Sequence, residues 1–269
     1  MAGKRGLVMG VANDHSIAWG IASALHAAGA ELAFTYQGEP FGKRVKPLAD
    51  SIGVTQMLPC DVDDEASLTA VFDHLGKTWG SLDFVVHAIA YSDKEELKGR
   101  YLDTTRANFR RTLLVSCYSF THVTRLAAPL MSAGGALITL SYIGAERVTP
   151  NYNVMGVAKA ALESSVRYLA TDLGADGIRV NCISAGPVRT LAGSAIADAR
   201  FTFGWTRDQS PMHRPVGLDE VGKAGLYLLS DLSSGVTGEV HYVDCGYHVI
   251  GIPSPRRLTL SEVSKAKGG

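Results

Sequence analysis

Short apolar runs alternate along the chain with longer stretches in which apolar residues recur at helical spacing. Strands are predicted at 6–9, 31–36, 56–60, 82–88, 136–141, 178–184 and 239–243. Helices are predicted at 17–28, 41–52, 65–79, 103–132 and 152–173. The runs 82–88 and 136–141 are almost continuously apolar, which is typical of strands covered on both faces.

Repeated strand–helix–strand order predicts a parallel sheet with right-handed crossovers. The expected fold class is α/β: a single-domain, doubly wound parallel sheet (Rossmann-like) with helices on both faces and a substrate-covering insertion. Residues 1–252 are predicted to form one dinucleotide-binding catalytic domain. Within it, 187–215 is long and poor in strand signal, so we expect a substrate cover there; the alternative is a plain helical excursion. Residues 253–269 are basic and apolar-poor, and are predicted to be a flexible tail.

Composition narrows the class of protein. The 269 residues are 46% hydrophobic, which excludes a disordered chain, and the formal net charge of zero argues against nucleic-acid binding. No apolar stretch approaches the roughly 18 residues that span a bilayer, and the N-terminus lacks the pattern of a signal peptide. We therefore expect a cytoplasmic protein with no membrane partner.

The cysteines and histidines do not form metal-binding motifs. Cys60, Cys117, Cys182 and Cys245 are widely scattered without a C-x-x-C pair. They are interpreted as small buried apolar residues. The eight histidines include no H-E-x-x-H motif, so no metal is predicted.

The turn after the first strand has the features of a phosphate-binding site. Gly10 begins a run of small and polar residues that ends at Ser16 and Ile17, where a helix is predicted to begin. The free N–H groups of a helix N-terminus attract a pyrophosphate. This is not a clean G-x-G-x-x-G motif, and an ordinary turn with Ser16 as N-cap is the alternative.

Two polar residues follow the second and third strands. Gln37 stands where NAD sites usually place an acid and NADP sites an arginine, which favours NADH. Lys43 and Arg44 come later, inside the next predicted helix. Asp61, followed by Val62, is interpreted as a contact for the adenine edge, or as an acid near the next helix N-terminus.

Tyr152 and Lys159 form the candidate catalytic pair. They are seven residues apart, nearly two helical turns, so both side chains leave one face of the predicted helix. They also follow the carboxyl end of a strand, where parallel sheets bind ligands. A surface lysine beside a buried tyrosine is the alternative.

Three stretches of sequence resemble one known family. They are LSYIGAER (140–147), PNYNVMGVAKA (150–160) and RVNCISAGPVRTL (179–191). They look like the NADH-dependent enoyl-acyl-carrier-protein reductases of bacterial fatty-acid synthesis, within the short-chain dehydrogenase/reductase superfamily. The resemblance runs from about residue 3 to about 251. It is specific, because the wider superfamily spaces its tyrosine and lysine by four.

The resemblance implies a set of site residues. Tyr142, Tyr152 and Lys159 match the family's catalytic residues, and Ser92, Tyr142 and Tyr152 match its substrate contacts. The matched cofactor contacts are Gly10, Ser16, Ile17, Gln37, Asp61, Val62, Ile89, Lys159, Val188, Arg189, Thr190, Leu191 and Ala192. The family also implies NADH, with NADPH as the alternative, a homotetramer, and an enoyl thioester carried by acyl carrier protein.

The implied reaction reduces the trans-2 double bond of the thioester. Hydride goes to the β-carbon, Tyr152 stabilises the enolate oxygen, and Lys159 holds the nicotinamide ribose. Tyr142 either orients the thioester or walls the pocket. The alternative functions are a short-chain carbonyl reductase or alcohol dehydrogenase, and a non-catalytic dinucleotide-binding protein.

The chain departs from the family at a few positions. Tyr91 stands at a phenylalanine position of the family. Arg200 is kept in the cover segment, but Ala197 and Phe201 replace lysines that some relatives present to the acidic carrier protein.

Overall fold

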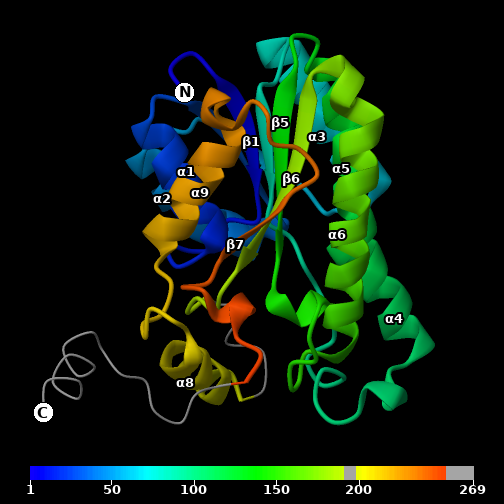
Figure 1. The fold of residues 1–269 in the computed structure, drawn as a ribbon. Coiled ribbons are helices and arrows are strands. Elements are labelled where there is room, and N and C mark those ends of the chain that lie inside the picture. The colour runs from blue at the N-terminus through cyan, green and yellow to red at the C-terminus, as the bar shows by residue number, and fades with distance from the viewer. Residues whose placement is uncertain (191–197, 253–269) are drawn as a thin grey trace, which may run out of the picture.

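A seven-stranded parallel sheet runs through the centre of the molecule (Figure 1). The computed structural model describes residues 1–190 and 198–252. The strand order is β3-β2-β1-β4-β5-β6-β7, and every neighbouring pair is parallel. The strands are β1 (Arg5–Met9), β2 (Glu31–Tyr36), β3 (Gln56–Pro59), β4 (Phe84–His87), β5 (Gly135–Ser141), β6 (Ile178–Ala185) and β7 (Val240–Val243). The predicted doubly wound α/β fold is confirmed.

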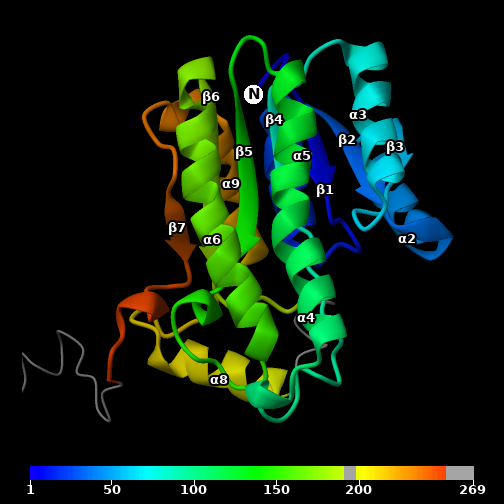
Figure 2. The ribbon, with the colours of Figure 1, turned by 90° about the vertical axis from the view of Figure 1, so that its right-hand side faces the viewer.

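Helices cover both faces of the sheet (Figures 1 and 2). On one face lie α1 (Ile17–Ala27), α2 (Gly38–Ser51) and α9 (Leu218–Leu229); on the other lie α3 (Glu65–Trp79), α5 (Ser119–Ala127) and α6 (Asn153–Leu173). Helices α4 (Arg106–Leu113) and α8 (Ala199–Gln209) lie at the end of the molecule where the strands finish. No helix in the described ranges is long and apolar enough to cross a membrane.

Two hydrophobic cores fill the space between the sheet and its helices. Successive residues of a strand face opposite ways, so Leu7 and Met9 enter one core and Val8 the other. All three side chains are fully buried, and burying each one contributes about 2 kcal/mol. The four cysteines are buried and free, as predicted. The nearly continuous apolar runs are thus explained by burial on both faces.

The sequence of strands creates a switch point between β1 and β4. The chain builds outward from β1 through β2 to β3, and then returns to place β4 on the other side of β1. The connections leave β1 and β4 toward opposite faces, and open α/β sheets bind ligands beyond the carboxyl ends of strands at such a point. Both the predicted phosphate turn and the residues after β4 lie at this edge.

Several predicted boundaries differ from the structure. The single helix predicted over 103–132 is wrong: it is divided into a 3₁₀ turn (Tyr101–Asp103), α4, a π-helical turn (Leu114–Tyr118), α5 and a second 3₁₀ turn (Ala128–Leu130). Helix α2 begins three residues before its predicted start, because Pro40 is tolerated in the first helical turn. The other predicted strand and helix ends differ from the structure by no more than two residues, and β2 and α3 match at both ends.

Helix α9 has no counterpart among the predicted elements. Its glycines weaken a helical pattern, but they are needed where α9 packs on α1. A Cβ at Gly222 would lie 2.4 Å from the carbonyl oxygen of Gly20, and one at Gly225 would lie 2.9 Å from Ile21. The two helices therefore approach so closely that only hydrogen atoms fit between them.

We predict that Gly222→Ala lowers the free energy of unfolding by about 2 kcal/mol, because α1 and α9 must separate to admit a methyl group. Helix propensity alone predicts the opposite sign. Gly204→Ala in α8 is the matched control: a Cβ there meets nothing within 4 Å, so it should stabilise the protein by up to about 1 kcal/mol. Urea unfolding of the three proteins measures both changes; stabilisation by Gly222→Ala would contradict the packing.

Candidate active site

Tyr152 and Lys159 lie at the carboxyl end of β5, as their place after that strand predicts. Tyr152 is the N-cap residue of α6 rather than part of its first turn. It stands between Asn151 and Asn153, whose φ angles of 58° and 40° lie in the left-handed region that asparagine tolerates. Tyr152 is 7% exposed and Lys159 is 6% exposed. The sharp turn into α6 thus fixes the tyrosine inside the protein, close to the strand.

The Lys159 ammonium is anchored to the sheet. Its Nζ donates a hydrogen bond of 2.7 Å to the carbonyl oxygen of Leu140, the residue before the last one of β5. Burial lowers the pKa of Lys159 to about 8, against smaller opposing effects of Cys182, Cys117 and Glu163. At neutral pH the lysine is a buried cation, and it has no ion-pair partner among the described residues.

Tyr142 and Tyr152 form an aromatic pair. Their ring centroids are 5.2 Å apart with planes at 72°, an edge-to-face contact. Burial raises the pKa of Tyr142 to about 12 and raises that of Tyr152 further. Both phenols therefore keep their protons at neutral pH and can donate hydrogen bonds. Leu97 packs against the pair from the loop after β4.

Glu163 is a buried acid that the sequence interpretation missed. It follows Lys159 by one turn of α6, and its carboxyl accepts a hydrogen bond from the Ser141 hydroxyl. Burial raises the pKa of Glu163. Leu140 and Ser141 of β5 thus hold the side chains of Lys159 and Glu163 on adjacent turns of α6. The i,i+4 spacing of these two residues in the sequence could have indicated that Glu163 lies near the site.

The turn after β1 has the shape of a phosphate cradle. Gly10 has φ 101°, and a Cβ there would lie 2.1 Å from the carbonyl oxygen of Ala88. The Ser16 hydroxyl accepts hydrogen bonds of 3.0 Å from the N–H groups of Ala12 and Asn13, so it shapes the turn instead of capping α1. The N–H of Trp19 already bonds to the carbonyl oxygen of Ser16 at 3.0 Å, so the N–H groups of Ile17 and Ala18 are the ones left for a ligand at the start of α1. A dinucleotide's pyrophosphate fits this set of groups.

Gln37 and Asp61 meet at the ends of β2 and β3. The Gln37 amide donates a hydrogen bond of 2.9 Å to Asp61. The first turn of α3 is capped by Asp64, whose side chain accepts from Ala66 and Ser67, so Asp61 does not cap that helix. Val62 packs on the core beside it. This pair places a carboxylate and an amide together at this edge of the sheet.

The loop after β4 is held by the irregular helix that follows. Ser92 accepts a hydrogen bond of 2.9 Å from Thr112 and one of 3.2 Å from Asn108. Ser116, within the π-helical turn, bonds to both the N–H and the carbonyl of Tyr91, each at 2.9 Å. π-Turns inside helices recur at functional sites. Here the turn fixes the loop, and Ile89 packs on the core at its start.

The segment after β6 carries a helix across the site. The Arg189 guanidinium lies 4.8 Å from the Phe203 ring centroid of α8, and Val188 packs on the core. Phe201 and Trp205 stack at 6.0 Å and are largely exposed. Leu191 and Ala192, two of the predicted cofactor contacts, lie outside the described residues, as do Ala197 and the predicted tail at 253–269.

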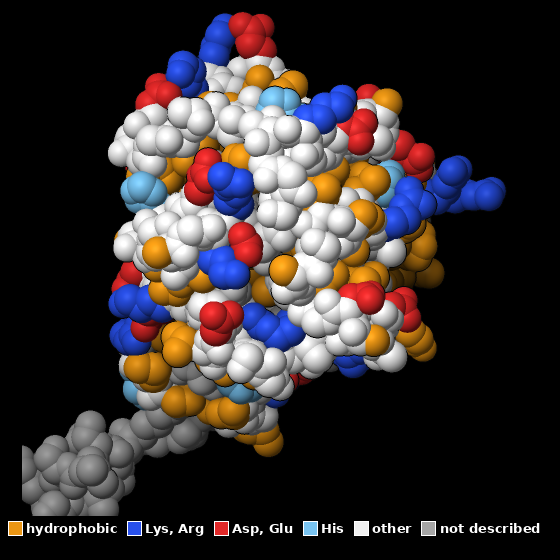
Figure 3. Space-filling model, turned by 90° about the horizontal axis from the view of Figure 1, so that it is seen from above, with side chains coloured by type: hydrophobic (Ala, Val, Ile, Leu, Met, Phe, Trp, Pro, Cys, Tyr) orange, Lys and Arg blue, Asp and Glu red, His pale blue; other side chains and the backbone are white. Residues whose placement is uncertain are grey.

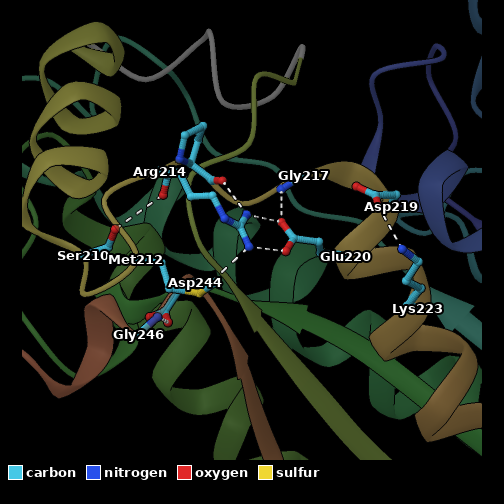
Figure 4. A network of polar contacts seen from close by, with 10 residues as sticks. Ser210, Met212, Arg214, Gly217, Asp219, Glu220, Lys223, Asp244 and Gly246 are labelled. Atoms are coloured by element: carbon cyan, nitrogen blue, oxygen red, sulfur yellow. Dashed lines mark hydrogen bonds and ion pairs between the residues drawn. The ribbon is translucent and has the colours of Figure 1, made fainter. Parts of the chain in front are cut away.

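An ion pair at Arg214 fixes the C-terminal end of the segment that follows β6 (Figure 4). Both guanidinium nitrogens of Arg214 bond to the Glu220 carboxylate at 2.7 Å, and Glu220 also accepts from the N–H of Gly217. Arg214 and Gly217 together lower the pKa of Glu220 to about 2. The ion pair joins the end of the segment to the N-terminus of α9.

Comparison with known proteins decides the family. The family profile described as enoyl-(acyl carrier protein) reductase matches residues 10–248. Enoyl-[acyl-carrier-protein] reductase [NADH] 2 of Rhizobium meliloti is 62% identical over 262 residues, which cover 97% of this chain and 98% of the relative. This chain belongs to the enoyl-acyl-carrier-protein reductase family.

Solved structures of similar proteins agree with this membership. FabI of Candidatus Liberibacter asiaticus is 59% identical, with a TM-score of 0.92 that covers 94% of this chain and 98% of that one. The enoyl-acyl-carrier-protein reductase of Anaplasma phagocytophilum, crystallised in complex with NAD, is 60% identical with a TM-score of 0.92, covering 94% and 97%.

The sheet of this reductase gathers most of the predicted site residues at one edge. Six strands contribute a residue just beyond their carboxyl ends: Gly10, Gln37, Asp61, Ile89, Tyr142 and Val188. Direct contacts join Gln37 to Asp61 and Tyr142 to Tyr152. Within the described ranges no group of three or more His, Cys, Asp or Glu side chains is arranged to hold a metal ion.

We predict that Lys159→Met stabilises the cofactor-free protein. A lysine whose pKa falls from its ordinary 10.5 to about 8 on folding is penalised for its charge at every pH below 8. The penalty fades between pH 8 and 10.5, because the unfolded chain alone is still protonated there. Methionine removes it, so the free energy of unfolding at pH 7 should rise on the order of 2 kcal/mol.

Chemical denaturation from pH 7 to 10.5 measures this difference, which should shrink as pH rises. Tyr168→Phe, at an exposed position of the same helix, is the control and should show no pH-dependent change. A Lys159→Met protein less stable than its parent at pH 7, or a difference that grows with pH, would show that the ammonium is well stabilised in the fold.

Proposed function

We propose that this chain reduces the trans-2 double bond of enoyl-acyl-carrier-protein in fatty-acid synthesis, using NADH. The observation that carries the proposal is the arrangement at the end of β5: two buried phenols in contact, with a buried ammonium anchored to the same strand. Membership of the NADH-dependent reductase family and the relative crystallised with NAD support the cofactor.

The residues at the edge of the sheet divide the work of binding. Gly10, Ser16 and Ile17 receive the pyrophosphate at the N-terminus of α1. Gln37, Asp61 and Val62 line the adenosine end, while Ile89, Lys159 and the stretch from Val188 to Ala192 border the nicotinamide end. When bound, the nicotinamide supplies a hydride to the β-carbon of the substrate.

Tyr152 stabilises the charge that develops on the thioester oxygen. Its pKa is raised by burial, so it acts as a neutral donor and keeps its proton. Tyr142 orients the thioester through its contact with Tyr152, and Ser92 in the loop after β4 is a further substrate contact. The Lys159 ammonium would hold the ribose hydroxyls of the cofactor and would add positive potential near the forming enolate. The apolar faces of Phe201 and Trp205 cover the acyl chain and exclude water.

A neutral Tyr152 is sufficient for the reduction of C=C. A carbonyl reductase must deliver a proton to oxygen, so its tyrosine is asked to ionise. An enolate oxygen requires only a hydrogen bond. The homotetramer, the cytoplasmic localisation, and the absence of nucleic-acid and membrane partners belong to the same proposal.

We predict that Tyr152→Phe slows turnover of crotonyl thioester roughly a hundredfold or more, because one hydrogen bond to the developing oxyanion is lost. Its affinity for NADH, measured by nucleotide fluorescence, should equal that of the parent. Tyr168→Phe makes the same chemical change at an exposed position of α6 and should leave turnover unchanged. Wild-type turnover in Tyr152→Phe would remove Tyr152 from the mechanism.

The substrate class is tested by supplying two thioesters to the same enzyme. Crotonyl thioester with NADH should be reduced, and acetoacetyl thioester should not; NADPH in place of NADH should be used more slowly. Faster reduction of the acetoacetyl compound would favour the carbonyl-reductase alternative. Nucleotide binding without turnover of either thioester would favour the non-catalytic alternative.

A further inference from the structure

A concentration of positive charge borders the loop that leads to α4. Residues 98–111 include one acidic residue, Asp103, and five basic residues: Lys98, Arg100, Arg106, Arg110 and Arg111. All five basic side chains are exposed. We call these five side chains the α4 basic rim. The whole chain has a formal net charge of zero, and the acids Glu95 and Glu96 stand just before the rim.

Internal ion pairs leave three members of the α4 basic rim unused. Lys98 pairs with Glu95, and Arg111 lies 3.4 Å from Asp63 and over the Tyr91 ring. Across the described ranges, the side chains of Arg100, Arg106 and Arg110 form no ion pair or hydrogen bond. Three guanidiniums are thus available to a partner.

The stability of α4 does not explain two of these arginines. Arg106 is the first residue of the helix, where a cation opposes the helix dipole. Arg106 and Arg110 are spaced i,i+4, so their like charges repel along one face. Both effects disfavour the helix by tenths of a kcal/mol. Neither arginine is therefore explained by the stability of α4.

The α4 basic rim is tied to the catalytic tyrosine. The Asn153 amide donates to the carbonyl oxygens of Leu97 at 3.0 Å and Gly99 at 3.3 Å, and Leu97 packs against Tyr152. Helices α4 and α8 lie at the same end of the molecule, on either side of the carboxyl edge of the sheet (Figure 2). A macromolecule that contacts the rim is thereby placed beside the entrance to the site.

The opposite end of the molecule has a different distribution of charge. Figure 3 views the end at which the strands begin, and Lys and Arg side chains there are interspersed with Asp and Glu. Lys4 pairs with Asp83 and Arg5 with Glu31 in this region, each at 2.9 Å. Lys4 and Arg5 at this end are thus compensated by acids, unlike the three arginines of the α4 basic rim.

Helix α8, on the other side of the entrance, offers little positive charge. Phe201 is 63% exposed and apolar, and Arg207 is paired with Asp208 at 2.6 Å. Arg200 is the remaining cation of that helix. An acidic partner approaching this end therefore meets more unpaired positive charge on the α4 side.

We propose that the α4 basic rim docks the acidic surface of the acyl carrier protein and positions its thioester arm at Tyr152. The inference rests on the proposed function, since it names the docking surface for that substrate. Charge complementarity at an exposed rim acts mainly on encounter and affinity, and not on the chemical step. The rim should therefore affect KM for the carrier-bound substrate and leave kcat unchanged.

The test compares Arg106→Gln/Arg110→Gln with a matched control, Lys77→Gln/Arg125→Gln. The control also removes two exposed cations, from the last turns of α3 and α5. Each protein reduces crotonyl-acyl-carrier-protein and crotonyl-coenzyme A with NADH at low salt. Thermal melting and sedimentation verify that fold and oligomeric state are retained.

The rim variant should show KM for the carrier-bound substrate raised about tenfold, with KM for the coenzyme A substrate and both kcat values unchanged. The control variant should match the parent, and 0.5 M salt should erase the difference. An unchanged carrier KM would overturn the docking surface. Equal increases for both substrates would overturn it as well, because they indicate recognition of the phosphate that both carry. A parent enzyme that reduces neither thioester would instead contradict the proposed function.

Discussion

The buried ammonium of Lys159 is the constraint on which the site depends. It is held by the carbonyl oxygen of Leu140, so it joins α6 to the last residues of β5. Burial removes water from this cation, and the desolvation lowers the pKa of Lys159. The desolvated Lys159 ammonium lies beside two neutral phenols and can bind the hydroxyls of a ligand. Ser141 and Glu163 make a second connection between the same strand and helix.

The rest of the fold places groups around that cation. The switch in strand order between β1 and β4 brings the glycine turn, the Gln37–Asp61 pair and the loop after β4 to one edge. The π-helical turn holds that loop through Ser116. The tight contact of α9 with α1 supports the phosphate turn from behind, and the Arg214–Glu220 ion pair fixes the cover segment to α9. Stability and function thus share the same elements.

Much of this could be predicted from the sequence because local signals agree with the fold. Helix α3 matches its predicted range, since Asp64 caps its start and Gly80, in the left-handed region, ends it. Tyr152 and Lys159 were found from their spacing and their place after a strand. Other features depend on tertiary contacts. The need for glycine at position 222 comes from the nearby carbonyl of Gly20, and the position of the Asp61 carboxylate comes from its hydrogen bond with Gln37. The π-helical turn at residues 114–118, which separates α4 from α5, contains no proline or glycine from which it could be predicted.

The central claim, that this site adds hydride to a carbon–carbon double bond, is tested most directly by isotope transfer. The enzyme would be supplied with crotonyl thioester and NADH that carries deuterium at the transferable position, in ordinary water, and the product examined by NMR. Deuterium on the β-carbon of a saturated butyryl thioester, with protium from water at the α-carbon, is the predicted result. Deuterium at the α-carbon, or an unlabelled product, would contradict it.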